Sequence, residues 1–385
     1  TGRVSGQESV TITQCYEWAR ANYPQIHQMG LIDQTERYSL SNVGKAWLPQ
    51  LSVSGKASYQ SDVTKLPLDG DKISSLLPGF EIPSLSKDQY QVVAQVDQTI
   101  WDGGSTRSAR ALTRAEAIAN REQLESELYA LNDRVNQIYF GCLLQDELIR
   151  QNALLQKELQ VNIERIEAMM ENGVANQSDL ESMEVELLNA RQNEIELKAS
   201  RTVYRQMLAT FINKPLTDQV VLKTPESPER SLSTQINRPE LRALDAKSEW
   251  IETQNKQVTA GLMPRIGAFV QGGYGRPGLN MLEDSFEPYY VAGVRLSWNL
   301  GKLYTLKNDR RKIEVSRRQI DVQRETFLFN TRLQLLQQNT EIKKMTDLMR
   351  ADDDIIRLRT SIKQAAEVKL ENGVISVTDL IREIN

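Results

Sequence analysis

Four short segments of the chain alternate between apolar and polar residues, the pattern of β-strands with one apolar and one polar face. In the first segment, Leu51, Val53 and Tyr59 alternate with serines and with Lys56. The four segments lie at about 50–60, 90–101, 265–274 and 289–299. We therefore expect two pairs of strands, each with one face that needs to be kept from water.

Aromatic side chains stand at the ends of these segments and are sorted by type. Tryptophans lie at the ends that join predicted helices, namely Trp47, Trp101 and Trp298. Tyrosines lie at the ends that join loops, namely Tyr59, Tyr90, Tyr274 and Tyr290. A tilted strand that crosses a bilayer needs about 9 to 11 residues, and membrane barrels carry aromatic girdles at both interfaces. The pattern predicts that these seven residues form a membrane girdle.

A soluble antiparallel sheet that packs on its own helices would show the same alternation, but it does not require aromatic residues at both strand ends. Four strands cannot close a barrel, and an open sheet in lipid would leave backbone groups unpaired along both edges. We therefore expect three chains to share a barrel of about twelve strands, which is wide enough for a lumen. The helices all leave from the tryptophan end, so they are expected to form a second cylinder on that side.

Long stretches without proline connect the strand pairs, and they are rich in Leu, Glu, Gln, Arg and Ala. These residues favour helices, so the fold is predicted to be mainly α with a small β part. Apolar residues in the first stretch recur at near-heptad spacing, as at Leu124, Leu128 and Leu131, which is typical of coiled-coil packing. If unbroken, a helix from Ser105 to Met170 is about 100 Å long, more than a compact globular domain needs.

Two parts of the chain repeat one another. ENGVANQSDL begins at Glu171 and ENGVISVTDL at Glu371, while AWLPQLSV at Ala46 is matched by GLMPRIGAFV at Gly261. Each half is predicted as a helix, a strand pair, a long helix, an Asn-Gly turn and a further helix. We expect a first repeat at 1–212, a proline-containing equatorial linker at 213–236 and a second repeat at 237–385. The second repeat is C-terminally incomplete by this comparison, so a further helix is expected beyond it.

Composition excludes several classes of function. The net charge is −4, and basic residues are mixed with acidic ones rather than forming a stripe, which argues against nucleic acid as a partner. No run of about 18 apolar residues is present, so no transmembrane helix is expected, and no signal peptide is recognised at the start of the sequence.

Few residues are candidates for chemistry. His27 is the only histidine and has no ligand-type neighbours at metal-binding spacing. The aspartates of ADDDIIR, which starts at Ala351, point apart on a helix and are expected to be solvated. Cys15 and Cys142 are expected to be buried thiols. We therefore predict no enzyme activity, no metal and no cofactor.

In the order and spacing of these features, nearly the whole chain resembles the TolC-type outer-membrane efflux factors. The resemblance rests on the duplication, on the strand-to-helix junction VDQTIWDGGSTRSARA at Val96, and on two Gly-centred turns, each followed by Asp six residues later. It implies a homotrimer in the Gram-negative outer membrane, whose twelve-stranded barrel continues into a long α-helical tunnel in the periplasm. It also implies a passive exit duct that works with a periplasmic adaptor and an inner-membrane RND or ABC pump.

The resemblance also implies roles for the helix turns. Adaptor hairpins would dock at the periplasmic tips, whose residues are Asn172, Gly173, Val174, Asp179, Asn372, Gly373 and Val374. Asp379 would line the closed periplasmic mouth as part of an acidic ring. Family members with a strong acidic gate can carry a second Asp where this chain has Arg382, and a pair with Asp379 would make the mouth less anionic. For Asp179, plain helix capping is an equally good interpretation.

Three interpretations of function stay open. The first is a trimeric duct, either of a tripartite efflux pump or of type I protein secretion. The second is a structural stalk or adhesin anchored by the shared barrel, and the third is a soluble coiled-coil scaffold. The duplication favours the duct, because an anchor needs only one strand pair and one helical hairpin.

Overall fold

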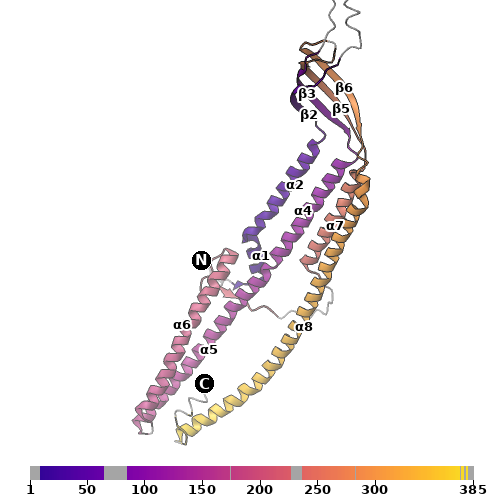
Figure 1. Ribbon diagram of the computed structural model, residues 1–385. Helices are drawn as coiled ribbons and strands as arrows, with labels where there is room; N and C mark the ends of the chain where they lie inside the picture. Colours follow the sequence, from indigo (N-terminus) through magenta and orange to yellow (C-terminus); the bar gives the residue numbers. More distant parts are fainter. Residues whose placement is uncertain are drawn as a thin grey trace, which may run out of the picture. The chain divides into compact units, whose positions relative to one another are not determined.

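The computed structural model describes residues 9–64, 85–173, 175–226, 236–281, 283–372, 374–376 and 379. Long helices dominate, together with a four-stranded sheet and one short strand pair (Figure 1). The elements are β1 (Ser9–Val10), α1 (Ile12–Asn22), the 3₁₀-helix η1 (Pro24–His27), α2 (Gln28–Lys45), β2 (Gln50–Tyr59), β3 (Asp88–Trp101), α4 (Ser105–Tyr129), α5 (Leu131–Glu171), α6 (Gln177–Ile212), β4 (Val221–Leu222), α7 (Pro239–Ala260), β5 (Arg265–Arg276), β6 (Glu287–Ser297) and α8 (Lys302–Glu371). Within the described residues, no helix combines the length and the apolar character needed to cross a membrane.

The chain divides into two compact units that each draw on both halves of the sequence. Unit 1 comprises 1–29, 123–241 and 323–385, and unit 2 comprises 30–122 and 242–322. The long helices α4 and α8 contribute residues to both units. This division cuts across the expected sequential repeats, so their boundaries stay a prediction.

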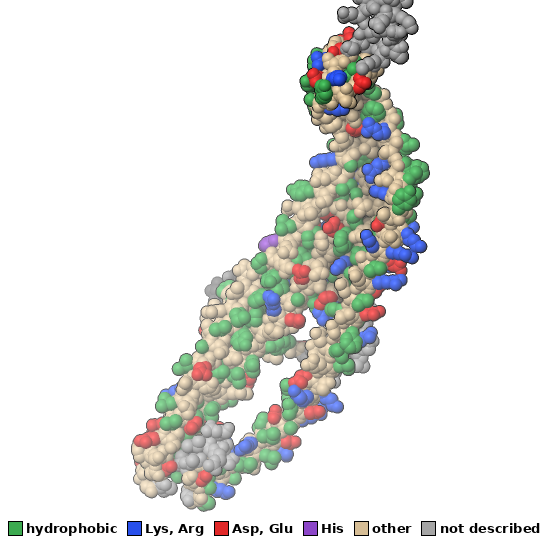
Figure 2. All heavy atoms as spheres, viewed as in Figure 1, with side chains coloured by type: hydrophobic (Ala, Val, Ile, Leu, Met, Phe, Trp, Pro, Cys, Tyr) green, Lys and Arg blue, Asp and Glu red, His purple; other side chains and the backbone are tan. Residues whose placement is uncertain are grey.

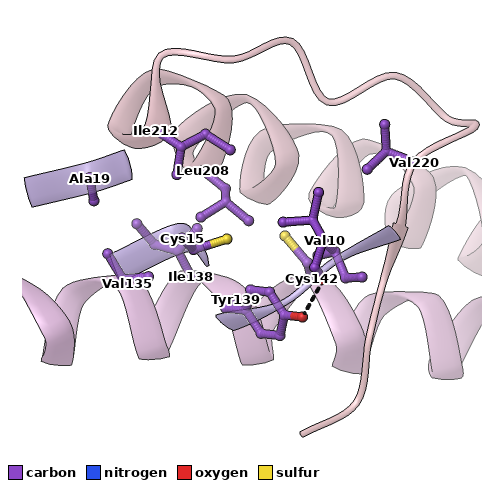
Figure 3. Packing of buried hydrophobic residues seen from close by; sticks show 11 residues of the cluster. Val10, Cys15, Ala19, Val135, Ile138, Tyr139, Cys142, Leu208, Ile212 and Val220 are labelled. Carbon is purple, nitrogen blue, oxygen red and sulfur yellow. Dashed lines mark hydrogen bonds between the residues drawn. The ribbon is translucent and has the colours of Figure 1, made fainter. Parts of the chain in front are cut away.

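In unit 1, α1 packs against the antiparallel helices α5 and α6 around one buried apolar cluster (Figure 3). Helix α1 begins at a capping box, in which Thr11 Oγ1 accepts from the Gln14 amide and Gln14 Oε1 accepts from the Thr11 amide. Cys15 on α1 and Cys142 on α5 are both fully buried in this cluster and are both free thiols. The prediction of buried thiols is therefore confirmed.

The segment that follows α6 is anchored to the same cluster. Strand β4 pairs in parallel with β1, bringing Leu222 opposite Val10. Arg205 on α6 is buried, and its guanidinium donates to the carbonyl oxygens of Thr217 at 2.8 Å and Val220 at 2.7 Å. The Thr217 carbonyl also accepts the Val220 amide at 3.0 Å, so Arg205 ties an already formed turn to α6.

A second cluster of unit 1 joins the ends of three helices. Its buried members lie on α5 (Leu159, Ile163, Ile166), α6 (Met183, Leu187, Ala190) and α8 (Ala366, Leu370). Lys363 on α8 also pairs with Glu158 on α5. The end of α8 therefore packs on the hairpin formed by α5 and α6.

In unit 2, all four strands of the sheet pair antiparallel in the order β2-β3-β5-β6 (Figure 1). The central pairing, β3 with β5, joins a strand of the first half to a strand of the second half. Helices α7 and α8 pack through Ile251, Ile313 and Ile320, and Arg317 pairs with Glu252 at 2.8 Å. The structure is thus mostly helical with a small antiparallel sheet, as the sequence predicts.

The long helix expected from Ser105 to Met170 is interrupted once. Helix α4 ends at Tyr129 and α5 begins at Leu131. At Ala130 the backbone is helical in φ but its ψ of −17° loosens the turn. The Ala130 amide still donates to the Ser126 carbonyl at 3.3 Å, so the interruption is a local loosening between two helices.

Candidate functional site

The apolar face of the sheet is exposed. Cross-strand pairing aligns Val53 with Ala94, Ala94 with Gly272 and Gly272 with Tyr290, which places the apolar positions of all four strands on one face. Each strand keeps large apolar side chains more than half exposed on this face: Leu51, Val53, Val92, Val270, Val294 and Leu296. A sheet face this apolar needs a cover, and the described residues of one chain do not supply it.

Both edges of the sheet are open. Strands β2 and β6 are the outer strands, and within the described residues neither pairs with another strand on its outer side. β2 and β6 thus present rows of backbone amide and carbonyl groups at the two edges. These groups are suited to pairing with further copies of the same sheet.

The aromatic residues predicted as a girdle lie at the two ends of the sheet and are all exposed. At the loop end, Phe286 stacks on Tyr90 and Tyr274, with ring centroids 6.4 and 5.7 Å away. The Arg276 guanidinium lies over both Tyr90 and Phe286. At the other end, the indole of Trp298 donates to the Leu262 carbonyl at 2.9 Å.

The opposite face of the sheet carries polar side chains that contact one another. Gln95 Nε2 donates to Asp97 Oδ2 at 2.7 Å, and Arg295 Nη1 lies 3.8 Å from Asp97 Oδ1. The Arg295 guanidinium also lies over the Phe269 ring, 4.8 Å from its centroid. This face can therefore line an aqueous space, while the apolar face cannot.

Two glycines leave room for aromatic rings on the polar face. A Cβ at Gly293 would lie 3.1 Å from the Phe269 ring, and a Cβ at Gly273 would overlap the Tyr289 ring. Both rings therefore lie against the sheet over a neighbouring strand. Their position keeps them from projecting far into the space in front of the polar face.

The passage from strand to helix is a tight turn. Gly103 and Gly104 have φ of +65° and +85°, which side chains other than glycine tolerate poorly. Asp102 accepts the amides of Gly104 at 2.9 Å and Thr106 at 2.6 Å, so it caps α4. Burial would raise the pKa of Asp102, but the hydrogen bonds from Thr106 and Gly104 outweigh it and lower that pKa. The carboxylate thus stays ionised at the helix start.

The first predicted tip is a well-defined turn between α5 and α6. Gly173 has φ of +73°, and the Asn172 side chain donates to the Ala168 carbonyl at 2.8 Å. Asn176 and Asp179 form a capping box, in which each side chain accepts the other's backbone amide. Capping is therefore an observed role of Asp179. Val174 lies outside the described residues.

The second predicted tip repeats this arrangement in part. Asn372 donates its side-chain amide to the Val368 carbonyl at 2.8 Å, and Val374 is exposed. Asp379 is exposed, and its carboxylate accepts from the Ser376 hydroxyl at 2.8 Å. Gly373 and Arg382 lie outside the described residues, so the proposed pair of Arg382 with Asp379 stays a prediction.

The two tips are brought together by the helix ends. Ala175 from the first turn and Ile375 from the second both pack against the cluster that contains Ile166, Met183 and Leu370. The structure therefore joins the two Gly-centred turns, which are far apart in sequence, through one apolar cluster. The docking and gate roles stay predictions.

A family model described as outer membrane efflux protein matches residues 15–214, more than half of the chain. The chain belongs to the outer membrane efflux protein family. In a comparison with curated proteins, no sequence matches it.

Solved structures of outer-membrane proteins share the fold. A structure of CusC, from a study of its transmembrane channel formation, aligns with a TM-score of 0.65 and 13% identity over 97% of this chain and 85% of that chain. The outer-membrane protein VceC of Vibrio cholerae aligns with a TM-score of 0.62 and 13% sequence identity, over 97% of this chain and 89% of that chain. The open-state outer-membrane channel MtrE of Neisseria gonorrhoeae aligns with a TM-score of 0.61 and 14% sequence identity, over 97% of this chain and 82% of that chain. At these identities the likeness shows the fold of the efflux family and not the cargo.

Sequence reasoning missed some residues at the loop end of the sheet. Phe286, Arg276 and Asp284 form a cluster with the girdle tyrosines, in which Arg276 pairs with Asp284 at 3.8 Å. Phe286 and Asp284 lie in the turn between β5 and β6, where no alternation of apolar and polar residues identifies them. The charge of Arg276 at the end of an apolar strand face was the one available signal.

Proposed function

We propose that three copies of this chain form an outer-membrane exit duct. Each copy contributes its four strands to a shared barrel of about twelve strands, and its helices to a tunnel that extends into the periplasm. The duct passively exports small molecules that an inner-membrane RND or ABC pump delivers through a periplasmic adaptor. The assignment to the outer membrane efflux protein family supports this role.

The observation that carries the proposal is the state of the sheet. Its apolar face is exposed, and in the part of the chain that the structure describes its two outer strands have no partner on their outer sides. In lipid, an apolar face is stable while an unpaired backbone edge is not. Sharing the sheet between copies pairs the edges, turns the apolar face to lipid and encloses the polar face around a lumen.

The helices support the same arrangement. In the C-terminal half of α8, large apolar side chains such as Leu336, Met349 and Ile356 are more than half exposed. Figure 2 shows hydrophobic side chains among charged ones along this helix. Neighbouring copies would cover these residues in a closed ring of helices, and the tips joined by the Leu370 cluster would form its periplasmic end with Asp379 at the mouth.

Two neighbouring residues of β2 test the proposal. Val53 lies on the apolar face and Ser54 on the polar face, so arginine at the two positions should have opposite consequences. Arg on the lipid face near the bilayer midplane costs about 2–4 kcal/mol, and each trimer would carry three copies. Val53→Arg should therefore abolish the detergent-extracted trimer in outer-membrane fractions, whereas Ser54→Arg should assemble and change single-channel current.

The outcomes separate the competing functions. Equal assembly of both variants would overturn the membrane sheet. Trimers that insert but carry no current in a planar bilayer would overturn the duct and support an anchored stalk. A secretion duct is distinguished by export of a polypeptide, rather than of small molecules, when the chain is expressed with its pump.

A further inference from the structure

The polar face of the sheet carries more positive than negative charge. This face presents Lys56, Arg265 and Arg295 together with two described carboxylates, those of Asp97 and Glu287. These residues are assigned to the polar face because side chains alternate along each strand. Lys56 pairs with Gln91, and Gln91 lies on the same face of β3 as Asp97. Each chain thus has a surplus of one positive charge on this face.

The two arginines are neighbours. Arg265 on β5 lies opposite Ser297 on β6, and Arg295 on β6 lies opposite Gly267 on β5. Diagonal positions of this kind on adjacent strands are about 7–8 Å apart, within reach of long side chains. Two guanidinium groups therefore share one end of the polar face, next to the passage into the helices.

The available carboxylates leave this charge largely uncompensated. Asp97 lies 3.8 Å from Arg295, at the long end of an ion pair, and also accepts from Gln95. Asp102 is buried and binds the amides at the start of α4. Within the described residues, the polar contact of Arg265 is with the Ser105 hydroxyl at 3.2 Å. Both guanidinium groups thus keep N–H donors that face solvent.

An open cavity lies at this place. Its volume is about 320 Å³, and it is lined by residues that include Arg265, Arg295, Asp97, Asp102 and Phe269. Phe269 supplies a flat apolar wall, and Arg295 lies over its ring. Guanidinium groups bind carboxylates and related anions, and an aromatic wall suits a flat apolar body.

We infer that the polar face of the sheet is an anion-attracting site in the duct, and that it favours organic anions with an aromatic body as cargo. This inference rests on the proposed function, because the polar face becomes a lumen only when the sheet is shared. Three chains would then place a surplus of three positive charges around one lumen. Rings of Arg and Lys are the means by which pores select anions.

The effect should depend steeply on salt. The Debye length is about 30 Å at 0.01 M and about 3 Å at 1 M, so side chains on the barrel wall influence ions at its centre only at low ionic strength. Ions that cross the duct would pass both the barrel and the predicted acidic mouth at Asp379, and the mouth favours cations. The site in the barrel is therefore best measured in an Asp379→Asn background, which removes the opposing charge.

The experiment is the reversal potential of single channels across a low-salt KCl gradient. Relative to the Asp379→Asn background, adding Arg265→Gln and Arg295→Gln should lower the chloride-to-potassium permeability ratio by about threefold or more. Asp97→Asn should raise the ratio, and Arg265→Lys with Arg295→Lys, which keeps the charge, should retain it. Raising both solutions to 1 M KCl should remove the differences.

Benzoate and acetate as added anions test the aromatic preference. Benzoate should reduce the chloride current more than acetate does, and the double glutamine variant should lose this difference. Channels that conduct, but whose chloride-to-potassium permeability ratio is the same in all of these variants, would overturn the charged site. Equal effects of benzoate and acetate would overturn the aromatic preference, and a complete lack of current from inserted trimers would instead overturn the duct itself.

Discussion

The hydroxyl of Tyr139 lies 2.9 Å from the Val10 carbonyl oxygen (Figure 3) and 2.7 Å from that of Lys223. One buried side chain of α5 thus reaches the backbone of β1 and the residue that follows β4. The hydroxyl has a single proton, so it donates to one carbonyl at a time. The contact links the N-terminal strand and the segment after α6 to the same helix.

Tyr139→Phe should lower the stability of unit 1. The substitution keeps the buried ring and removes the hydroxyl's hydrogen bond, which costs about 0.5–1.5 kcal/mol because the Val10 carbonyl still accepts the Lys223 amide. The measurement is the thermal midpoint of the purified protein by circular dichroism. Tyr38→Phe, at an exposed position of α2, is the control and should change stability by less than about 0.5 kcal/mol. Equal midpoints for both variants would contradict a structural role for the hydroxyl.

The folded protein should lose stability in alkaline solution. Burial raises the pKa of Cys15 and of Cys142 from 9.0 to about 11, so the native state holds these protons longer than the unfolded state. The stability that they contribute is complete below pH 9 and is lost as the pH rises through 11. Urea unfolding between pH 8 and 11 should show a steeper decline for the natural protein than for a Cys15→Ala, Cys142→Ala variant. Parallel declines would contradict the shifted pKa values.

The two thiols should react slowly in the folded state. With a pKa of about 11, only about one thiol in a thousand is ionised at pH 8, and both sulfur atoms are shielded from solvent. Mass spectrometry after brief treatment with iodoacetamide should find no modification of native protein and two adducts after unfolding. Rapid labelling of either cysteine in native protein would show that α1 detaches from α5.

Leu370→Ala should release the end of α8. Leu370 is buried against Ile166 and Met183, and truncating such a side chain costs about 2–5 kcal/mol. Because α8 has few other partners near this end, we expect local opening, seen as faster amide hydrogen exchange in residues 360–372. Ile356→Ala is the matched control, since Ile356 is exposed on the same helix. If exchange near Leu370 stayed slow, this cluster would not be what secures the tip.

Asp379→Asn should change conductance if this residue lines the mouth. Asparagine removes the charge while keeping an oxygen that can accept from Ser376, so the local hydrogen bonds are disturbed little. Single-channel steps should become larger and less cation-favouring. Asp179→Asn is the matched control, because Asp179 occupies the equivalent capping position in the first turn. Steps unchanged in both variants would place the constriction elsewhere.

Sequence patterns anticipated the elements whose signal is local. Alternating residues identified the four strands to within about two residues, and the proline-free stretches identified the long helices. The strand-to-helix junction that contains Gly103 was also expected, whereas the cap at Asp102 was not. Each of these features depends on neighbours in sequence, such as the φ that glycine permits or the period of a pleated strand.

Features that depend on distant partners were missed. Strands β1 and β4 have two residues each, too few to show a period. Arg205 has the sequence context of a surface helix residue, yet it is buried, and its guanidinium donates to the carbonyl groups of residues 217 and 220. Phe286 lies in a turn, and only the folded sheet brings its ring onto Tyr90 and Tyr274.

The sequence by itself determined which residues of the sheet share a face, because side chains alternate along any strand. It also determined the aromatic ends and where the long helical stretches lie. Only the tertiary structure decided that β3 pairs with β5, that Arg265 and Arg295 become neighbours, and that two distant turns share one apolar cluster. These outcomes depend on which strand edges pair and which apolar surfaces pack together. Such pairing and packing involve residues far apart in the sequence.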